Sequence, residues 1–254
     1  MIDRRVNLVI ADGIARLSFA SADGRNAVSL GFARQFAEAA EHCRTRLDVR
    51  VILMRAEGPF FSVGGDLAEI VAQGDHMATH IFEMASTVSR AVEYLRAADA
   101  PVVLALNGTA AGGGFSFVTG ADLVIAARSA KLVSAFTKSG LTPDAGASWF
   151  LPRIVGSQRA FLLLAMNPVL SAEEAERLGL VAKVVEDEAL ERETQSLVTT
   201  LAALPGSTLA SLKQLLRLSG TLSLTDQLAC EARSISHMLE ETSTRAALEA
   251  FFRR

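Results

Sequence analysis

Two glycine turns and one aspartate are the features of this sequence best suited to chemistry. In the first turn, Gly64 and Gly65 lie between the apolar run at 60–63 and an apolar-periodic run that starts at Leu67. Glycines at a strand-to-helix junction let the main chain approach a ligand closely, and amides at a helix start carry partial positive charge. The segment can therefore hold a developing oxyanion. An ordinary glycine turn capped by Asp66 explains the same residues.

A second glycine turn, Gly112 to Gly114, follows the apolar run PVVLAL and precedes another helical stretch. A dinucleotide-binding fingerprint would need glycine where Phe117 stands, and no Gly-Lys-Ser/Thr follows for a P-loop. Ser116 occupies the serine position of a G-x-S-x-G nucleophile motif, but Val118 replaces the closing glycine. The pattern therefore argues against phosphate binding and against a Ser116 nucleophile.

The third feature is Asp144, which lies between Pro143 and a flexible Ala-Gly-Ala segment. A carboxyl group in an apolar pocket gains affinity for protons and can act as a general base and acid. The aromatic residues near these segments, which form either such a pocket or part of the core, are Phe115, Phe117, Phe136 and Trp149. A simple turn, in which the aspartate accepts hydrogen bonds from the following main-chain amides, is the alternative.

The elements that must position these residues alternate between strands and helices. Two runs flanking Ala-Asp-Gly at 11–13 predict a hairpin, and helical periodicity separates the later strands. The predicted strands cover 6–10, 14–19, 49–56, 102–106 and 123–127. This alternation is typical of the α/β class.

Beyond about Ser171, helical periodicity replaces the strand signals. We therefore predict a core over residues 1–195 and a C-terminal helical region over residues 196–254. Because no linker or low-complexity segment separates them, this region should pack on the core or on a neighbouring subunit.

Composition narrows the possible partners. The formal net charge is -3, and the charged residues are scattered along the chain, without the basic stripe that nucleic acid would require. The apolar runs are shorter than the roughly 20 residues needed to cross a bilayer, and the N-terminus lacks the pattern of a secretory signal. We expect a cytoplasmic protein with neither a nucleic-acid nor a membrane partner.

The potential metal ligands are sparse. Cys43 and Cys230 are far apart and lack CxxC spacing, which argues against a disulfide framework or a zinc site. His76 and His80 have the helical spacing that can present two imidazoles to a metal. Because Met77 follows His76 where a zinc-protease motif has glutamate, we predict no metal site.

Five segments, in this order, resemble the crotonase (enoyl-CoA hydratase/isomerase) family. They are RNAVS (25–29), FFSVGGDL (60–67), NGTAAGGG with ADLVIAA (107–127), GLTPDAGASWFLPRIVG (140–156) and LSAEEAERLGLVAKVV (170–185). The resemblance covers nearly the whole chain. It implies a crotonase-like spiral of ββα units, followed by a C-terminal helical region used for trimerisation, with a homotrimer or a dimer of trimers as the assembly.

The resemblance also implies roles for individual residues. The amides of Gly65 and Gly113 would form an oxyanion hole around the carbonyl oxygen of a CoA thioester. A donor of this kind contributes on the order of 3 kcal/mol to transition-state stabilisation. The thioester is then the substrate, and no cofactor is tightly bound. The residues expected along the CoA are Arg25, Ala27, Ser62, Gly64, Asp66 and Leu67, with Arg25 as a phosphate contact.

Two departures from the family pattern bear on the reaction. Hydratases of this family use two glutamates, at positions that Ser116 and Phe136 occupy here, so these two residues would line the substrate pocket without positioning a water. Asp144 instead falls where epoxyphenylacetyl-CoA isomerases of bacterial phenylacetate breakdown carry a proton-shuttling aspartate. In chlorobenzoyl-CoA dehalogenases the matching aspartate is a nucleophile.

We therefore predict an enzyme that isomerises the double bond of an enoyl-CoA, with Asp144 as proton shuttle. Three alternatives remain open. An enoyl-CoA hydratase with altered acid and base residues, or a CoA-thioester hydrolase or dehalogenase, would use the same oxyanion hole. A non-catalytic acyl-CoA binder would keep the glycine turns without the chemistry.

Overall fold

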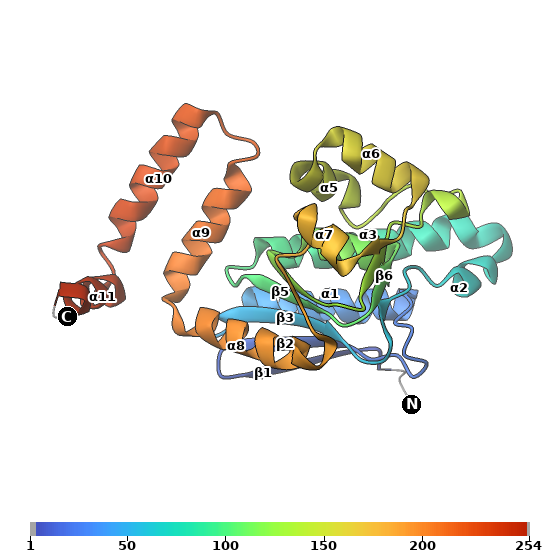
Figure 1. The fold of residues 1–254 in the computed structure, drawn as a ribbon, viewed down its shortest axis with the longest axis horizontal. Coiled ribbons are helices and arrows are strands. Elements are labelled where there is room, and N and C mark those ends of the chain that lie inside the picture. Colours follow the sequence, from blue (N-terminus) through green and yellow to red (C-terminus); the bar gives the residue numbers. More distant parts are fainter. Residues whose placement is uncertain (1–3, 253–254) are drawn as a thin grey trace.

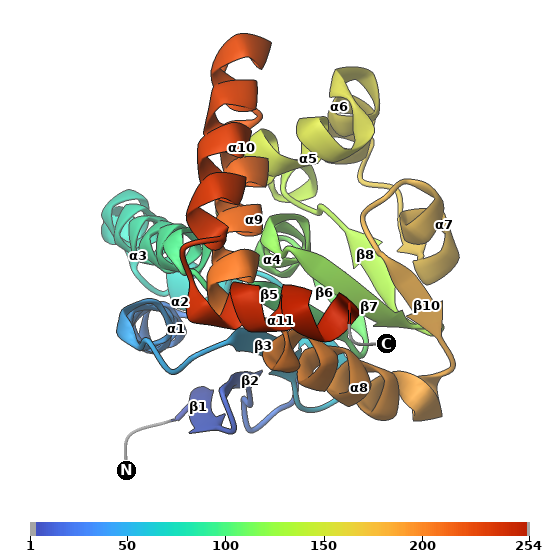
Figure 2. The ribbon, with the colours of Figure 1, turned by 90° about the vertical axis from the view of Figure 1, so that its left-hand side faces the viewer.

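The computed structural model describes residues 4–252 and shows two β-sheets surrounded by helices (Figures 1 and 2). The strands are β1 (Val6–Ala11), β2 (Ile14–Phe19), β3 (Val51–Ala56), β4 (Phe60–Ser62), β5 (Val102–Leu106), β6 (Thr109–Ala111), β7 (Leu123–Ala127), β8 (Lys131–Val133), β9 (Leu170–Ser171) and β10 (Lys183–Val185). The α-helices are α1 (Leu30–Thr45), α2 (Leu67–Val71), α3 (Met77–Ala97), α4 (Gly113–Gly120), α5 (Ala147–Val155), α6 (Ser157–Met166), α7 (Ala172–Arg177), α8 (Leu190–Ala203), α9 (Gly206–Leu218), α10 (Leu224–Met238) and α11 (Thr242–Phe252). Short 3-10 turns cover Gly74–His76, Thr137–Ser139 and Asp187–Ala189.

The six-stranded sheet has the order β1-β2-β3-β5-β7-β10. The predicted hairpin forms its edge, because β1 pairs antiparallel with β2 from Val6↔Phe19 to Ala11↔Ile14. All later neighbours in this sheet are parallel. Parallel strands need crossover connections, and those connections contain the elements that build the site.

The chain fills the two sheets alternately. Strands β3, β5 and β7 lie side by side in the large sheet, whereas β4, β6 and β8, which follow them, lie side by side in the four-stranded sheet β4-β6-β8-β9. Helices α2 and α3 follow β4, α4 follows β6, and α5 and α6 follow β8. This repeat is the predicted spiral of ββα units, and the α/β class is confirmed.

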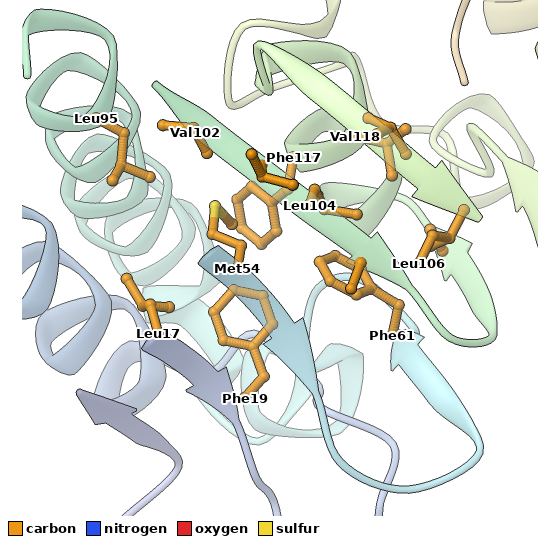
Figure 3. Close-up of a cluster of buried hydrophobic side chains, with 14 of the residues drawn as sticks. Leu17, Phe19, Met54, Phe61, Leu95, Val102, Leu104, Leu106, Phe117 and Val118 are labelled. Atoms are coloured by element: carbon orange, nitrogen blue, oxygen red, sulfur yellow. The ribbon is translucent and has the colours of Figure 1, made fainter. Parts of the chain in front are cut away.

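Buried aromatic rings join the large sheet to helices α1 and α4. Phe19 of β2 lies with its ring centroid 4.8 Å from Phe32 and 5.4 Å from Phe36, both edge-on, and 5.8 Å from Phe117. Phe19 and Phe117 belong to the buried cluster drawn in Figure 3. Such ring pairs contribute about 0.5–1.5 kcal/mol beyond their buried area. Because Phe117 belongs to α4, the cluster fixes that helix against the sheet.

The C-terminal helices attach to the core in two ways. Helix α8 spans the predicted boundary at 195/196 and packs on β2, β3, β5 and β7. Helix α9 carries Lys213, a buried lysine whose Nζ donates to the carbonyl oxygens of Leu95 and Ala100 at 2.9 Å and lies 3.0 Å from Asp122 Oδ2. This lysine ties α9 to the end of α3.

Helices α10 and α11 extend away from the sheets, with α10 running back alongside α9 (Figure 1). None of the α10 side chains is buried within the described part of the chain. The last residues of the predicted helical region, 253 and 254, lie outside the described residues. Within residues 4–252, no helix has the length and apolar character needed to cross a membrane.

Candidate active site

A cavity of about 470 Å³ opens where the two glycine turns meet helix α3 and the loop that contains Asp144. This volume suits a small ligand. The lining from the glycine turns comprises Val63, Gly64, Gly65, Gly112 and Gly113, α3 adds Ala78, Ile81, Phe82, Met84, Ala85 and Val88, and the Asp144 loop adds Leu141, Thr142, Pro143 and Asp144. The wall is therefore mainly apolar, with main-chain amides on one side and a carboxyl group on another.

The first glycine turn is held by a short parallel bridge to the segment before α1. The Val28 amide donates to Gly64 O at 2.8 Å, and the Asp66 amide donates to Val28 O at 2.9 Å. The carbonyl oxygen of Gly64 and the amide of Asp66, on either side of Gly65, therefore both point toward Val28. Because successive groups of an extended segment point to opposite sides, the Gly65 amide faces away from Val28.

The second glycine turn packs directly on the first. Gly64 has a φ of +89° and Gly112 a φ of +51°, conformations that side chains disfavour. A Cβ atom on Gly64 would lie 2.9 Å from Ala111 O and 3.3 Å from Gly113 N. Glycine at 64 is therefore required both by its backbone conformation and by this contact, which brings the two turns onto one wall of the cavity.

The amides of Gly65 and Gly113 are free donors: within residues 4–252, neither makes a hydrogen bond. Gly113 begins α4, so its N–H belongs to the first-turn amides that have no partner inside the helix. The partial positive charge of the helix start adds to this donor. Two unpaired amides lining one cavity can stabilise negative charge on an oxygen.

Asp144 is half-buried, and its Oδ1 is a buried atom without a hydrogen-bond partner among the described residues. The turn that follows is closed by the main chain, with the Ala147 amide donating to Asp144 O at 3.1 Å. Ala145 and Gly146 both have positive φ, at 48° and 87°. The side chain is thus not used to cap its own turn, and the strained Ala145 fits a backbone fixed by its surroundings.

Burial raises the pKa of the Asp144 carboxyl above its ordinary value, because removing solvent penalises the charged form. The nearby main-chain N–H of Asp144 itself lowers the pKa and offsets part of this effect. Asp144 is the one acidic residue lining this cavity in the described part of the chain. A single carboxyl with raised proton affinity can accept a proton and later return it.

The other predicted site residues divide into two groups. Leu67 and Phe136 line the cavity with Gly64 and Asp144. The residues that do not line it are Arg25, Ala27, Ser62, Asp66 and Ser116.

The residues outside the cavity have roles of their own. Ser62 is fully buried, donates to Asn26 O at 2.8 Å and accepts from the Gly64 amide at 3.2 Å, so it holds the first turn in place. Asp66 caps α2 by accepting from the Glu69 amide at 3.0 Å. Arg25 is exposed.

Ser116 is buried within α4, with its Oγ 3.4 Å from Gly112 O. Of the four nearby aromatic residues, Phe117 and Phe136 line the cavity, whereas Phe115 is buried without lining it and Trp149 is partly exposed elsewhere. The apolar surroundings of Asp144 therefore come less from aromatics than from α3, whose Met84 and Val88 recur at helical spacing.

Asn26 is a supporting residue that the sequence pattern did not single out. It is fully buried with a φ of 52°, and its Nδ2 donates to the carbonyl oxygens of Glu57 and Phe60 at 2.9 Å. Its Oδ1 accepts from the Ser21 amide at 2.9 Å. Asparagine tolerates this left-handed conformation. An asparagine within a turn-rich segment was therefore the one feature of the sequence that could have indicated this structural role.

Among the described residues, no group of three or more His, Cys, Asp or Glu side chains is arranged to hold a metal ion. His80 instead pairs with Glu69, with Nε2 and Oε1 2.9 Å apart. This pair links α3 to α2 beside the cavity.

Comparison with known proteins identifies the family. The family model for enoyl-CoA hydratase/isomerase matches residues 10–254. The chain is 33% identical to a protein of Rhodobacter capsulatus described as a probable enoyl-CoA hydratase, over 96% of this chain and 93% of that protein. It is 34% identical to the 1,2-epoxyphenylacetyl-CoA isomerase of Escherichia coli, over 87% and 85% of the two chains.

Solved structures agree with this result. A Mycobacterium abscessus protein assigned to the enoyl-CoA hydratases/isomerases superposes with a TM-score of 0.93 at 30% identity, covering 97% of this chain and 96% of the other. A Thermobifida fusca protein solved in complex with CoA gives a TM-score of 0.86 at 27% identity, covering 95% of each chain. The fold is that of a family of enzymes that act on CoA thioesters. The chain belongs to the enoyl-CoA hydratase/isomerase, or crotonase, family.

Proposed function

We propose that this enzyme moves the double bond of an enoyl-CoA, with the amides of Gly65 and Gly113 as an oxyanion hole and Asp144 as the proton shuttle. The observation that carries the proposal is the unpaired, buried Oδ1 of Asp144 in the same cavity as two amides that have no partner among residues 4–252. The isomerase of Escherichia coli, similar over most of its length, supports a proton-transfer reaction.

In the proposed reaction of a 3-enoyl-CoA, ionised Asp144 takes a proton from C2. The electron pair moves into the thioester, and the enolate oxygen accepts hydrogen bonds from Gly65 and Gly113. Asp144 then returns the proton to C4, and the double bond forms between C2 and C3. Removing one such donor costs on the order of 10²–10³-fold in rate in other enzymes, so the two amides can supply much of the rate enhancement.

Hydration is the second candidate, because the Rhodobacter capsulatus relative is named as a hydratase. Water addition to a conjugated enoyl-CoA needs an activated, positioned water. Asp144 is the one carboxyl among the described residues that line the cavity, whereas isomerisation needs only one group that accepts and returns a proton. The raised pKa of Asp144 likewise suits proton transfer better than nucleophilic attack by a carboxylate.

CoA binding along the rim of the first glycine turn completes the proposal. Leu67 lines the cavity. Arg25 is an exposed cation on the neighbouring segment. Its carbonyl oxygen accepts a hydrogen bond from the Val63 amide at 3.0 Å, which holds Arg25 beside the first glycine turn. A guanidinium there suits a phosphate. The related Thermobifida fusca structure contains CoA, which supports a CoA thioester as the substrate.

Mass spectrometry of 3-enoyl-CoA and 2-enoyl-CoA incubated in deuterated water tests the reaction. We expect deuterium incorporation with double-bond migration, lost by about 10²–10⁴-fold in Asp144→Asn. Asp75→Asn, an exposed acid outside the cavity, should retain full activity. Addition of water that survives Asp144→Asn would contradict the proposal in favour of a hydratase, and binding without exchange would indicate a non-catalytic binder.

A further inference from the structure

A second cavity, of about 450 Å³, is lined by residues that lie close in sequence to residues of the active-site cavity. Asp144 lines the first cavity and the next residue, Ala145, lines the second. On α3, Val88 lines the first and Val92 the second. Four helical residues rise about 6 Å, so on α3 the linings of the two cavities are about one helical turn apart.

The wall of the second cavity combines aromatic rings with guanidinium groups. Trp149 and Phe150 of α5 line it, with ring centroids 4.8 Å apart and edge-on. Arg96 of α3 and Arg217 of α9 line it as well. Arg153 lies beside it, with its guanidinium carbon 3.8 Å from the centre of the Trp149 ring.

Positive charge in this region exceeds negative charge. One carboxylate, Asp122, serves two cations, since it lies 3.0 Å from Lys213 and 3.8 Å from Arg96. Arg153 and Arg217 have no carboxylate within 4.0 Å among the described residues. Glu93 also lines the cavity, but it is exposed and forms no ion pair with these arginines in the described part of the chain.

Arg96 shows the effect of this imbalance most directly. Its Nε is buried without a hydrogen-bond partner among residues 4–252. Burial lowers the pKa of Arg96, Asp122 opposes this effect, and Arg217 and Arg153 lower the pKa further. An anion in the cavity would relieve the repulsion between the guanidiniums.

We propose that this second cavity binds a carboxylate at the far end of the substrate's acyl group, so that CoA thioesters of dicarboxylic acids are preferred. The apolar and aromatic wall accommodates the carbon chain or a ring, and Arg96 and Arg217 receive the carboxylate. This assignment rests on the proposed function, because the acyl group must enter from the active-site cavity past Asp144. It names the substrate class of that same site.

Trp149 provides a direct test, because it is the single tryptophan of the chain and lines this cavity. Its fluorescence is followed while adipoyl-CoA or suberoyl-CoA is added, with hexanoyl-CoA and octanoyl-CoA as probes of equal length that lack the carboxylate. These saturated thioesters do not require turnover. We expect the dicarboxylic thioesters to change the fluorescence and to bind about tenfold more tightly, the effect expected of one charge-assisted hydrogen-bonded pair.

Arginine variants locate the effect. Arg217→Gln and Arg96→Gln should each abolish the preference for the dicarboxylic thioester while leaving the affinity for octanoyl-CoA within about twofold, because only the charge-assisted bond is lost. Arg159→Gln, an exposed arginine on α6, is the matched control and should keep the preference. Circular dichroism checks that each variant is folded, and the two arginines provide independent tests.

The outcomes separate this inference from the proposed function. Equal affinity for both kinds of thioester in the wild type, together with proton exchange of a neutral enoyl-CoA, would overturn the carboxylate assignment and leave the isomerase proposal standing. Fluorescence changes by free adipate as strong as those by adipoyl-CoA would also overturn it, in favour of a separate anion site. Absence of both CoA binding and exchange would instead remove the proposed function on which the assignment rests.

Discussion

The proposed chemistry of this enzyme depends on polar atoms that the fold leaves without partners among the described residues. Asp144 Oδ1 has none among the described residues, and the amides of Gly65 and Gly113 make no hydrogen bonds there. Unpaired buried polar groups destabilise a protein, and they are retained where a ligand completes them. The site should therefore be less stable than a version in which these groups are neutralised.

Substitution of Asp144 by asparagine should stabilise the protein at neutral pH. The pKa of the carboxyl is raised from 3.8 in the folded state, so its favourable contribution to folding is present below pH 3.8 and is lost as the pH rises through the folded-state value. Near pH 7 the free energy of unfolding of the variant should exceed that of the wild type by about 0.5–2 kcal/mol. Denaturant titrations should show the difference shrinking below pH 3.8.

The same carboxyl should govern the pH dependence of the rate. In the proposed reaction Asp144 must be ionised to take the first proton, so kcat/KM should rise with pH through an apparent pKa above 3.8. A pH profile of isomerisation measures this value. A profile that stays flat down to pH 3.8 would argue against Asp144 as the base.

Contact between the two glycine turns can be tested at Gly114. A Cβ atom there would lie 2.8 Å from both the Cβ and the carbonyl oxygen of Ser62. Gly114→Ala should therefore push the turns apart, lower the free energy of unfolding by about 1–3 kcal/mol and reduce kcat. Gly31→Ala is the matched control, because that position in the first turn of α1 has only Ser29 Oγ nearby, at 3.7 Å. Thermal unfolding and turnover should leave the control unimpaired.

At the scale of elements, each turn of the spiral contributes one part of the site. The loop after β4 supplies the first glycine turn, the loop after β6 supplies the second, and the segment after β8 supplies Asp144. Helix α3 closes the cavity between them. The sheets therefore set the distance between the two glycine turns and the Asp144 carboxyl, and the loops need only present them.

Lys213 is the element-scale link between this core and the C-terminal helices. Burial lowers its pKa, while the nearby carboxylate of Asp122 opposes that effect. Lys213→Met would leave that carboxylate without its nearest cation and should lower the free energy of unfolding by about 3 kcal/mol. Hydrogen exchange should show faster opening of residues 206–218.

The double variant Lys213→Met with Asp122→Asn is the control for this prediction. It removes both charges and should recover part of the lost stability. If the single and double variants are equally unstable, the lysine acts through its bonds to Leu95 O and Ala100 O and not through the ion pair.

Much of this arrangement could be predicted from the sequence, because patterns within short segments determine it. The hairpin and the strands follow from alternating and β-branched runs, and the glycine turns follow from glycines between apolar segments. The roles of Ser62 and Asn26 could not be predicted, because their hydrogen bonds join segments that only the fold brings together. The cluster of Arg96, Arg153 and Arg217 likewise comes from three separate helices.

At the scale of the whole molecule, the C-terminal helices leave apolar side chains exposed. Helix α10 has no buried side chain in the described part of the chain, and its exposed apolar residues are Leu224, Leu228 and Ile235. Apolar faces of this kind mark interfaces. We predict a homotrimer or a dimer of trimers formed through this region.

Analytical ultracentrifugation of the wild type and of Ile235→Lys tests this assembly. We expect a trimer or hexamer for the wild type, and dissociation toward smaller species in the variant because a charge is desolvated at the interface. Glu240→Lys, at an exposed position just after α10, is the control and should keep the assembly. A monomeric wild type would contradict the prediction.

The alternation of strands between two sheets also has a consequence for how the chain acquires its structure. Each successive pair of strands adds one strand to each sheet. A partly folded chain that ends after β6 would therefore expose β5 and β6 as open edges, and one that ends after β8 would expose β7 and β8. Such edges pair readily with other chains. On a ribosome, Asp144 emerges after both glycine turns, so a nascent chain carries these turns before it carries the carboxyl. We therefore expect aggregation during synthesis to be most severe for chains truncated between β6 and β8.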